Sequence, residues 1–229
     1  MILCLETSTR SCSVALGKDG KILALKESVD EKYSHSENLT LYIESVCKQA
    51  SAKLRNVDAI AVSQGPGSFT GLRIGVSTAK GLCYSLDKPL IAINSLQAMA
   101  LGCINLKPGT SNQKHLYCPM IDARRMEVYC AVYDEHLKDI RTTSADIIDE
   151  KSFADLLAKN KMIFFGDGAE KCKSILAHSN AIFVDGINPS AQHMLPLAEK
   201  YFSEKKFEDV AYFEPFYLKD FITSSARSK

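Results

Sequence analysis

The sequence has no long apolar run and no excess of basic residues. Among its 229 residues, no uninterrupted apolar stretch approaches the roughly 20 that span a bilayer, so we expect no membrane-spanning helix. The first residues carry neither a basic n-region nor a long apolar h-region, which argues against a signal peptide. Lys and Arg number 28 against 27 Asp and Glu, a net charge of +1. Proteins that clamp RNA on their own carry a clear basic excess, so tight RNA binding by this chain alone is not expected.

Motifs that announce catalysis or redox chemistry are also missing. No two of the five histidines lie within four residues of each other, so the helical His-x-x-x-His pair of a metal site is absent. His35 is therefore expected to cap a helix or face solvent rather than bind metal. There is no Gly-x-Ser-x-Gly elbow and no P-loop Gly-Lys-Ser/Thr. These gaps argue against a metallopeptidase, and a metal site would have to assemble from residues distant in the sequence.

The eight cysteines include no C-x-x-C pair. Most of them lie within apolar periodic segments, as Cys4, Cys12, Cys47, Cys83, Cys118 and Cys130 do. In such segments cysteine behaves as a small buried hydrophobe, which suits a reducing compartment. We therefore expect structural thiols and a cytoplasmic location.

The apolar pattern predicts an order of elements that occurs twice. In the first half, strands are expected at 2–5, 12–16, 22–27, 58–63 and 90–93. Helices are expected after the capping box Ser34-His35-Ser36-Glu37, at 70–86 and, as a short helix, at 95–103. Asp19-Gly20 marks a tight hairpin, because a type I′ turn needs two positive φ angles. The second half predicts strands at 116–121, 127–133 and 137–142, then 152–159 as helix, 162–165 as strand, 169–178 as helix, 181–184 as strand, and a closing helix at 191–203.

Each half thus reads as three strands, helix, strand, helix, strand. Two copies of this order are typical of an α/β protein with the two-lobed actin-like ATPase fold, of the ribonuclease H-like (ASKHA) type, and not of a doubly wound sheet in which every strand is followed by a helix. We expect an N-terminal lobe at 1–104, a linker at 105–114, a C-terminal lobe at 115–222 and a flexible tail at 223–229.

A glycine-rich turn precedes the second long helix. Gly65-Pro66-Gly67 opens it, and a turn of this kind aims free backbone N–H groups at one point, which favours an anion; a plain strand-to-helix turn is an equally good interpretation. Within the helix, Gly71, Gly75 and Ala79 recur every fourth residue and leave one face nearly bare. Each interior glycine costs about 0.5–1 kcal/mol relative to alanine, so a closely packed neighbour should offset the loss. That neighbour is either the lobe's own sheet or a partner's helix.

The segment Gly65 to Gly75, GPGSFTGLRIG, resembles the signature of the TsaB (YeaZ-like) family. Supporting blocks follow one another along most of the chain: Leu5–Thr9, Tyr33–Glu37, Asp122–Arg125 with Glu127–Tyr129, Gly166–Ala169 and Glu214–Leu218. The family belongs to the wider group of threonylcarbamoyl-tRNA proteins. The resemblance implies the actin-like fold and a non-catalytic scaffold or activator subunit in tRNA threonylcarbamoyladenosine formation, with no activity of its own.

The resemblance also implies partners. Such a subunit pairs with a homologue of the catalytic protein TsaD, and the ATPase TsaE joins that pair. The subunit contacts tRNA only as part of the complex. When the chain is alone, a homodimer is expected. No cofactor is required, with weak ATP or ADP binding at the partner interface left open. In the family, the first two long helices make the contact, which nominates Leu39, Tyr42, Ile43, Leu72, Gly75, Val76 and Ala79.

A stand-alone enzyme, either a small-molecule kinase or an ATP-dependent acyltransferase, is the competing interpretation. An actin-like ATPase usually has an acidic residue at the end of its first strand to manage magnesium, and here Glu6 stands where many relatives have Asp. Asp122 occupies the matching turn of the second half, and Arg124 and Arg125 either face phosphate or form surface ion pairs. The remnant of a nucleotide or anion site would comprise Glu6, Thr7, Ser8, Gly65, Gly67, Ser68, Asp122, Arg124, Arg125, Gly166 and Asp167.

Overall fold

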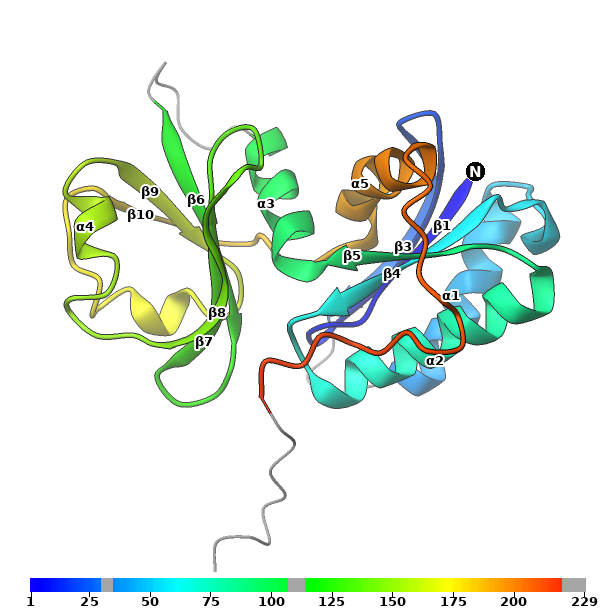
Figure 1. The fold of residues 1–229 in the computed structure, drawn as a ribbon, viewed down its shortest axis with the longest axis horizontal. Coiled ribbons are helices and arrows are strands. Elements are labelled where there is room, and N and C mark those ends of the chain that lie inside the picture. Colours follow the sequence, from blue (N-terminus) through cyan, green and yellow to red (C-terminus); the bar gives the residue numbers. More distant parts are fainter. Residues whose placement is uncertain (30–34, 107–113, 220–229) are drawn as a thin grey trace, which may run out of the picture.

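The computed structural model describes residues 1–29, 35–106 and 114–219, which form two lobes, each built on a five-stranded sheet (Figure 1). The first lobe contains β1 (Ile2–Glu6), β2 (Ser11–Lys18), β3 (Lys21–Val29), α1 (His35–Gln49), β4 (Ala59–Gly65), α2 (Phe69–Leu86) and β5 (Leu90–Asn94). The short 3-10 turn η1 (Leu54–Asn56) joins α1 to β4. Within the described ranges, no helix is both long enough and apolar enough to cross a membrane.

The second lobe repeats this order after α3 (Ser95–Leu106). Its elements are β6 (His115–Asp122), β7 (Glu127–Tyr133), β8 (Asp139–Ile147), α4 (Ala154–Leu157), β9 (Lys161–Phe165), the 3-10 turn η2 (Glu170–Cys172) and β10 (Ala181–Val184), followed by α5 (Ala191–Ser203). The strand order of the first sheet, β3-β2-β1-β4-β5, matches that of the second sheet read from its other edge, β8-β7-β6-β9-β10. In each sheet an antiparallel trio is extended by two parallel strands. The predicted two-lobed actin-like fold is confirmed.

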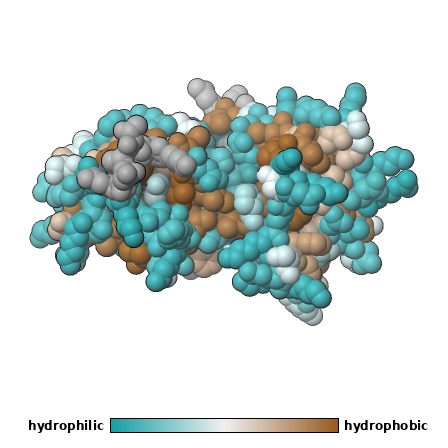
Figure 2. All heavy atoms as spheres, turned by 90° about the horizontal axis from the view of Figure 1, so that it is seen from above, coloured by the Kyte–Doolittle hydropathy of each residue, from teal (hydrophilic) through white to brown (hydrophobic). Residues whose placement is uncertain are grey.

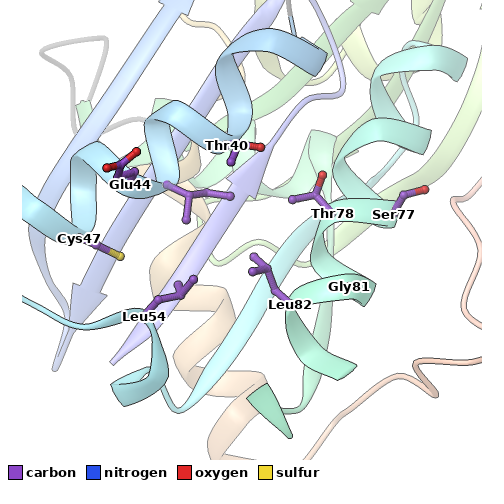
Figure 3. Close-up of a pocket in the computed structure, with 9 residues that line it drawn as sticks. Thr40, Glu44, Cys47, Leu54, Ser77, Thr78, Gly81 and Leu82 are labelled. Atoms are coloured by element: carbon purple, nitrogen blue, oxygen red, sulfur yellow. The ribbon is translucent and has the colours of Figure 1, made fainter. Parts of the chain in front are cut away.

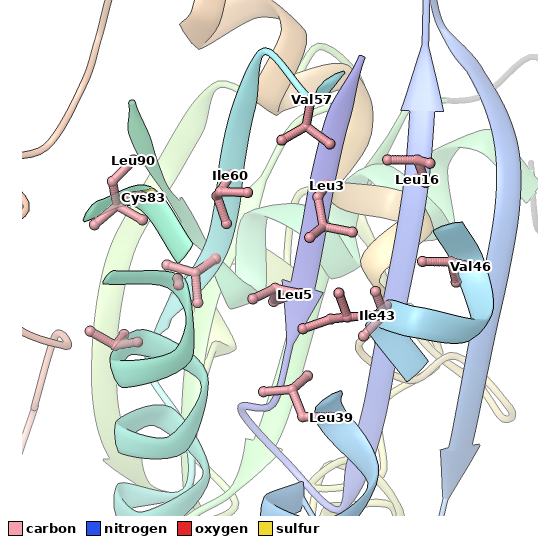
Figure 4. Packing of buried hydrophobic residues seen from close by; sticks show 14 of the residues in the cluster. Leu3, Leu5, Leu16, Leu39, Ile43, Val46, Val57, Ile60, Cys83 and Leu90 are labelled. Atoms are coloured by element: carbon pink, nitrogen blue, oxygen red, sulfur yellow. The ribbon is translucent and has the colours of Figure 1, made fainter. Parts of the chain in front are cut away.

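Both faces of the first sheet are buried, because successive side chains of its strands point in opposite directions. Leu3 and Leu5 of β1 pack against α1 and α2, where they meet Leu39 and Ile43 (Figure 4). Ile2 and Cys4, the alternate residues, join a second cluster with Ala191, Met194, Leu195 and Ala198 of α5. The lobe is therefore a three-layer sandwich with α1 and α2 on one face and α5 on the other.

The closing helices cross between the lobes. The predicted boundary at 104/115 separates the two sheets, but α3 covers the second sheet, with Leu96, Met99 and Cys103 packed against Tyr117 and Phe165. In return α5, which the sequence places in the C-terminal lobe, packs on β1, β2 and β5 of the first. The assignment of 115–222 to one lobe is wrong for its last part, because α5 and the chain after it bury their apolar residues against the first lobe.

Several expected elements differ in length. The helix expected at 152–159 is the single turn of α4, because Phe153 adopts a left-handed φ of 61° that lets its ring pack on Phe164 at 5.5 Å. The helix expected at 169–178 is reduced to the turn η2, whose hydrogen bonds join residues three apart, as from Cys172 N–H to Ala169 O. The strand expected at 137–142 begins later, because the Asp134 carboxylate accepts from the N–H groups of His136 and Lys138 and forms a turn there.

Other local predictions can be compared directly. Asp19 and Gly20 have φ angles of 51° and 74°, as the hairpin prediction requires. The capping box at 34–37, most of the linker and the predicted tail lie outside the described residues, in whole or in part. His35 is not solvent-facing: it is buried, and its Nε2 lies 2.7 Å from the carbonyl oxygen of Thr9. Seen from above, hydrophilic residues form most of the rim and hydrophobic ones gather in patches between them (Figure 2).

Candidate docking site

The turn after β1, where an actin-like ATPase would manage magnesium, is closed on itself. Glu6 is fully buried, and its Oε1 accepts the N–H of Ser8 at 2.6 Å. The N–H of Thr7 donates to Ser63 Oγ at 3.2 Å. Burial raises the pKa of the Glu6 carboxyl, only partly countered by the hydrogen bonds from Ser8, Ser63 and Thr7. A desolvated carboxyl that favours its neutral form is a poor magnesium ligand.

The glycine-rich turn packs directly against that turn. The N–H of Ser68 donates to Ser8 O at 2.6 Å, and the N–H of Gly71 donates to Ser68 Oγ, which caps α2. A Cβ at Gly67 would lie 2.1 Å from Ser8 O, so only glycine permits the approach. Two donors that an anion would need are therefore engaged within the chain. The plain strand-to-helix turn is the interpretation that these contacts favour.

The matching turn of the second lobe is open and charged. The Asp122 carboxylate accepts the N–H of Arg124 at 3.0 Å and pairs with the ammonium group of Lys171. The N–H of Asp122 donates to Asp167 Oδ1 at 3.0 Å, and Gly166, with φ of 101°, lets its loop lie against Met120 O. The structure thus brings together Asp122 and Asp167, two residues of the predicted nucleotide or anion site.

Arg124 and Arg125 lie at the tip of this turn with left-handed φ angles of 69° and 50°. Neither forms any of the ion pairs found between described residues, so the interpretation as surface ion-pairing residues gains no support. Across the lobes, Arg10 is close enough to lower the pKa of Asp167, whose net pKa is nevertheless raised, chiefly by desolvation. Nowhere in the described part of the chain do three His, Cys, Asp or Glu side chains gather as metal ligands. A nucleotide site stays a prediction.

Most residues predicted to meet a partner are turned inward. Leu39, Leu72, Val76 and Ala79 are buried in the first lobe's own core, so their assignment as surface contacts is wrong. Gly75 is buried too, and a Cβ there would lie 2.2 Å from Thr7 Oγ1. At Gly71 the conflict is with the carbonyl oxygen of Thr7, also at 2.2 Å. The bare glycine face therefore receives the β1 turn of its own lobe and not a foreign helix.

The outer side of the same helix pair carries a groove of about 440 Å³ (Figure 3). Its walls come from α1, η1 and α2: Thr40, Ile43, Glu44, Cys47, Leu54, Ser77, Thr78, Gly81 and Leu82. Of the predicted contact residues, Ile43 lines this groove, and Tyr42 lies partly buried beneath Lys26. At Gly81 a Cβ would meet nothing within 4 Å. The helix pair named from the sequence carries an open surface, but on a different face from most of the predicted residues, and its contact with a partner stays a prediction.

Sequence reasoning missed the groove residues because threonine, serine and glutamate in a helix read as an ordinary solvated face. One signal was present. Gly81 lies two residues after Ala79 and so falls outside the four-residue register of Gly71, Gly75 and Ala79. A glycine in the interior of a long helix but off the packed stripe has no packing reason in its own core, and it leaves a hollow on the exposed face. Leu41 of α1, three residues before the groove residue Glu44, is 59% exposed.

Comparisons with known proteins agree with this architecture. A family model described as TsaD, tRNA N6-adenosine threonylcarbamoyltransferase, matches residues 29–226. The tRNA threonylcarbamoyladenosine biosynthesis protein TsaB of Escherichia coli (strain K12) is 31% identical, with 96% of this chain and 94% of that protein covered. The solved structure of YeaZ from Pseudomonas aeruginosa superposes with a TM-score of 0.81 at 26% identity, covering 95% of this chain and 99% of that one.

The likeness extends to the enzymes for which the family model is named, over a shorter span. The tRNA N6-adenosine threonylcarbamoyltransferase of Kosmotoga olearia is 34% identical over 109 residues, which is 42% of this chain and 33% of that enzyme. The full-length matches are to TsaB proteins. The chain belongs to the TsaB family, within the wider family that the TsaD model describes.

Proposed function

We propose that this chain is a non-catalytic accessory subunit in tRNA threonylcarbamoyladenosine formation, and that it binds a TsaD-type partner through the groove between α1 and α2. The observation that carries the proposal is the groove itself. It is an open, largely apolar hollow of about 440 Å³ on the outer face of two long helices. Hollows of this kind between paired helices suit the apolar side chains of another helix.

The partner's type follows from the chain's own likeness. This protein resembles tRNA N6-adenosine threonylcarbamoyltransferases over part of its length, so such an enzyme should contain a comparable lobe with a comparable helix pair. Two related surfaces can pack about a pseudo-twofold axis, each helix pair in contact with the other. With no such partner present, a second copy of this chain would present the same surface, and a homodimer is the expected form.

The competing interpretation as a stand-alone kinase or acyltransferase gains nothing from the described residues. Its best candidate, Glu6, is buried and bonded to its own turn. Two N–H groups of the glycine-rich turn that could have faced phosphate, those of Ser68 and Gly71, already donate to Ser8 O and Ser68 Oγ. An ATPase of the TsaE type and the tRNA would join through the assembled pair, because a net charge of +1 gives this chain little attraction for RNA alone.

Gly81→Leu tests the proposal in isothermal titration against the cognate TsaD-type protein. The new side chain enters open space in the groove and improves helix propensity, so the fold should persist while binding is lost. The matched control is Ala158→Leu, which adds leucine at the exposed end of α4 in the other lobe and should bind as wild type. Unchanged affinity in Gly81→Leu, or steady ATP turnover by the chain alone, would overturn the proposal.

A further inference from the structure

A segment after α5, which we call the C-terminal strap (residues 207–218), lies along α2 on the side away from α1. In Figure 1 it leaves α5 in orange and runs back past α2 in red. The N–H of Glu208 donates to Leu90 O at 2.9 Å, near the end of α2, and that of Phe216 donates to Gln64 O at 2.7 Å, near its start. The strap therefore runs antiparallel to the helix over its whole length.

Side chains of α2 hold the strap in place. The ammonium group of Lys80 donates to the carbonyl oxygens of Ala211 and Phe213 at 3.1 and 3.0 Å. Tyr217 packs on Phe69 with ring centroids 4.8 Å apart, and its hydroxyl accepts from Arg73 Nε. A segment fixed at this many points is preorganised, so a partner that binds it loses little freedom in ordering it.

The strap alternates as an extended chain does. Phe213, Pro215 and Tyr217 are half-buried against α2, whereas Tyr212, Glu214 and Phe216 are exposed. Tyr212 is 84% exposed and Tyr84, in the last turn of α2, is 87% exposed. Tyr84 follows Lys80 by four residues and so shares the helix face that meets the strap. Large aromatic side chains left in water on a rigid surface are typical of protein interfaces.

This aromatic surface adjoins the proposed groove. A second hollow of about 170 Å³ lies between α2 and the strap, and Ser77 lines both hollows. The α1/α2 pair alone offers an outline of roughly 27 Å by 20 Å, because 18 helical residues rise about 27 Å and two packed helices are about 20 Å wide. The area of this outline, about 540 Å², falls short of the roughly 800 Å² that each partner buries in a specific interface. The strap widens the available surface on one side of the helix pair.

We propose that the strap is the second half of the docking surface, and that the TsaD-type partner contacts Tyr212, Phe216 and Tyr84 together with the groove. The inference rests on the proposed function, since it concerns the same partner. It assigns the C-terminal strap a binding role in addition to its packing on α2. The partner surface that it fits is apolar, with a hydrogen-bond acceptor or donor within reach of the tyrosine hydroxyls.

The test is titration of the double variant Tyr212→Ser/Phe216→Ser against the cognate TsaD-type protein. Both side chains are exposed, so the fold should persist while affinity falls at least tenfold. Ile147→Ser is the matched control, because Ile147 is 75% exposed on the edge strand β8 of the other lobe and should leave affinity unchanged. Lys80→Ala keeps the aromatic residues but frees the strap, and should weaken binding several-fold.

A photo-crosslinking residue at position 212 supplies the second measurement, and it should capture the TsaD-type partner in the mixture of the two proteins. Capture of a second copy of this chain instead would overturn the choice of partner. Wild-type affinity in the double variant, with binding still abolished by Gly81→Leu, would sink the strap inference and leave the proposed function standing. Failure of the wild-type chain to bind at all would remove both.

Discussion

Replacing Gly71 by alanine should test whether the glycine stripe of α2 is reserved for the chain's own β1 turn. The added Cβ would lie 2.2 Å from the carbonyl oxygen of Thr7 and 3.2 Å from the His35 ring. The first distance is more than 1 Å short of an ordinary carbon–oxygen contact. Thr7 is fully buried and its carbonyl belongs to the backbone, so rotation of a side chain cannot relieve the overlap.

The magnitude follows from two opposing effects. Overpacking of a tight site costs about 1–3 kcal/mol. Alanine recovers at most about 0.5–1 kcal/mol of helix propensity, and less than that at the third residue of α2, which lies in the first turn. Gly71→Ala should therefore lower the free energy of unfolding by about 1–2 kcal/mol. Gly81→Ala makes the same chemical change in the same helix where nothing lies within 4 Å, and should raise it by about 0.5–1 kcal/mol.

Urea unfolding of both variants and the wild type, followed by far-ultraviolet circular dichroism, measures the change in the free energy of unfolding. The comparison uses the midpoints of curves whose dependence on urea concentration has the same slope. The two variants must shift the midpoint in opposite directions. A Gly71→Ala protein as stable as Gly81→Ala would refute the conclusion that the β1 turn packs against the Gly71/Gly75 face of α2. That face would then again be a candidate for contact with a partner.

Two further results are expected. Because burial raises the pKa of Glu6 above 4.5, the folded state retains a proton that the unfolded chain releases, so its contribution to stability is present below pH 4.5 and is lost as the pH rises through the folded pKa. Glu6→Gln should flatten this fall of the urea midpoint as the pH rises above 4.5, and a wild-type midpoint that rises relative to the variant would contradict it. Seven thiols are at most 2% exposed whereas Cys47 lines the groove, and burial raises the pKa of Cys83 and Cys103 to about 12, so a thiol reagent should label the folded protein at Cys47 at most and the unfolded chain at eight positions; rapid labelling of further thiols before unfolding would be the opposite result.

Local chemistry made most of the fold predictable. Alternation along β1 and β2, the Asp19-Gly20 hairpin and the Ser68 cap of α2 are all decided within a few residues. The short α4 and η2 were not predictable, because both are shaped by long-range contacts. Phe153 packs against Phe164 on β9, and the side chain of Lys171 in η2 pairs with Asp122 on β6.

The candidate site shows the same limit. A stripe of Gly71, Gly75 and Ala79 says that something approaches α2 closely, but periodicity along one helix does not say what. The neighbour is Thr7, more than 60 positions earlier in the chain, and only the folded sheet brings it there. Conversely, the groove joins Ile43 to residues such as Thr40, Glu44 and Ser77, whose types carry no interface signal, and only the packing of α1 beside α2 brings them together.

The crossing of α3 and α5 has a consequence for how the molecule holds together. Each half of the chain supplies the lid of the other half's sheet, so a fragment that ended after β5 would leave Ile2, Cys4, Ile91 and Ile93 without the helix that covers them. Neither half is then a self-sufficient folding unit, and separately expressed halves should become structured only on mixing. Because each sheet is covered by a helix from the other half of the chain, we expect the two lobes to unfold as one.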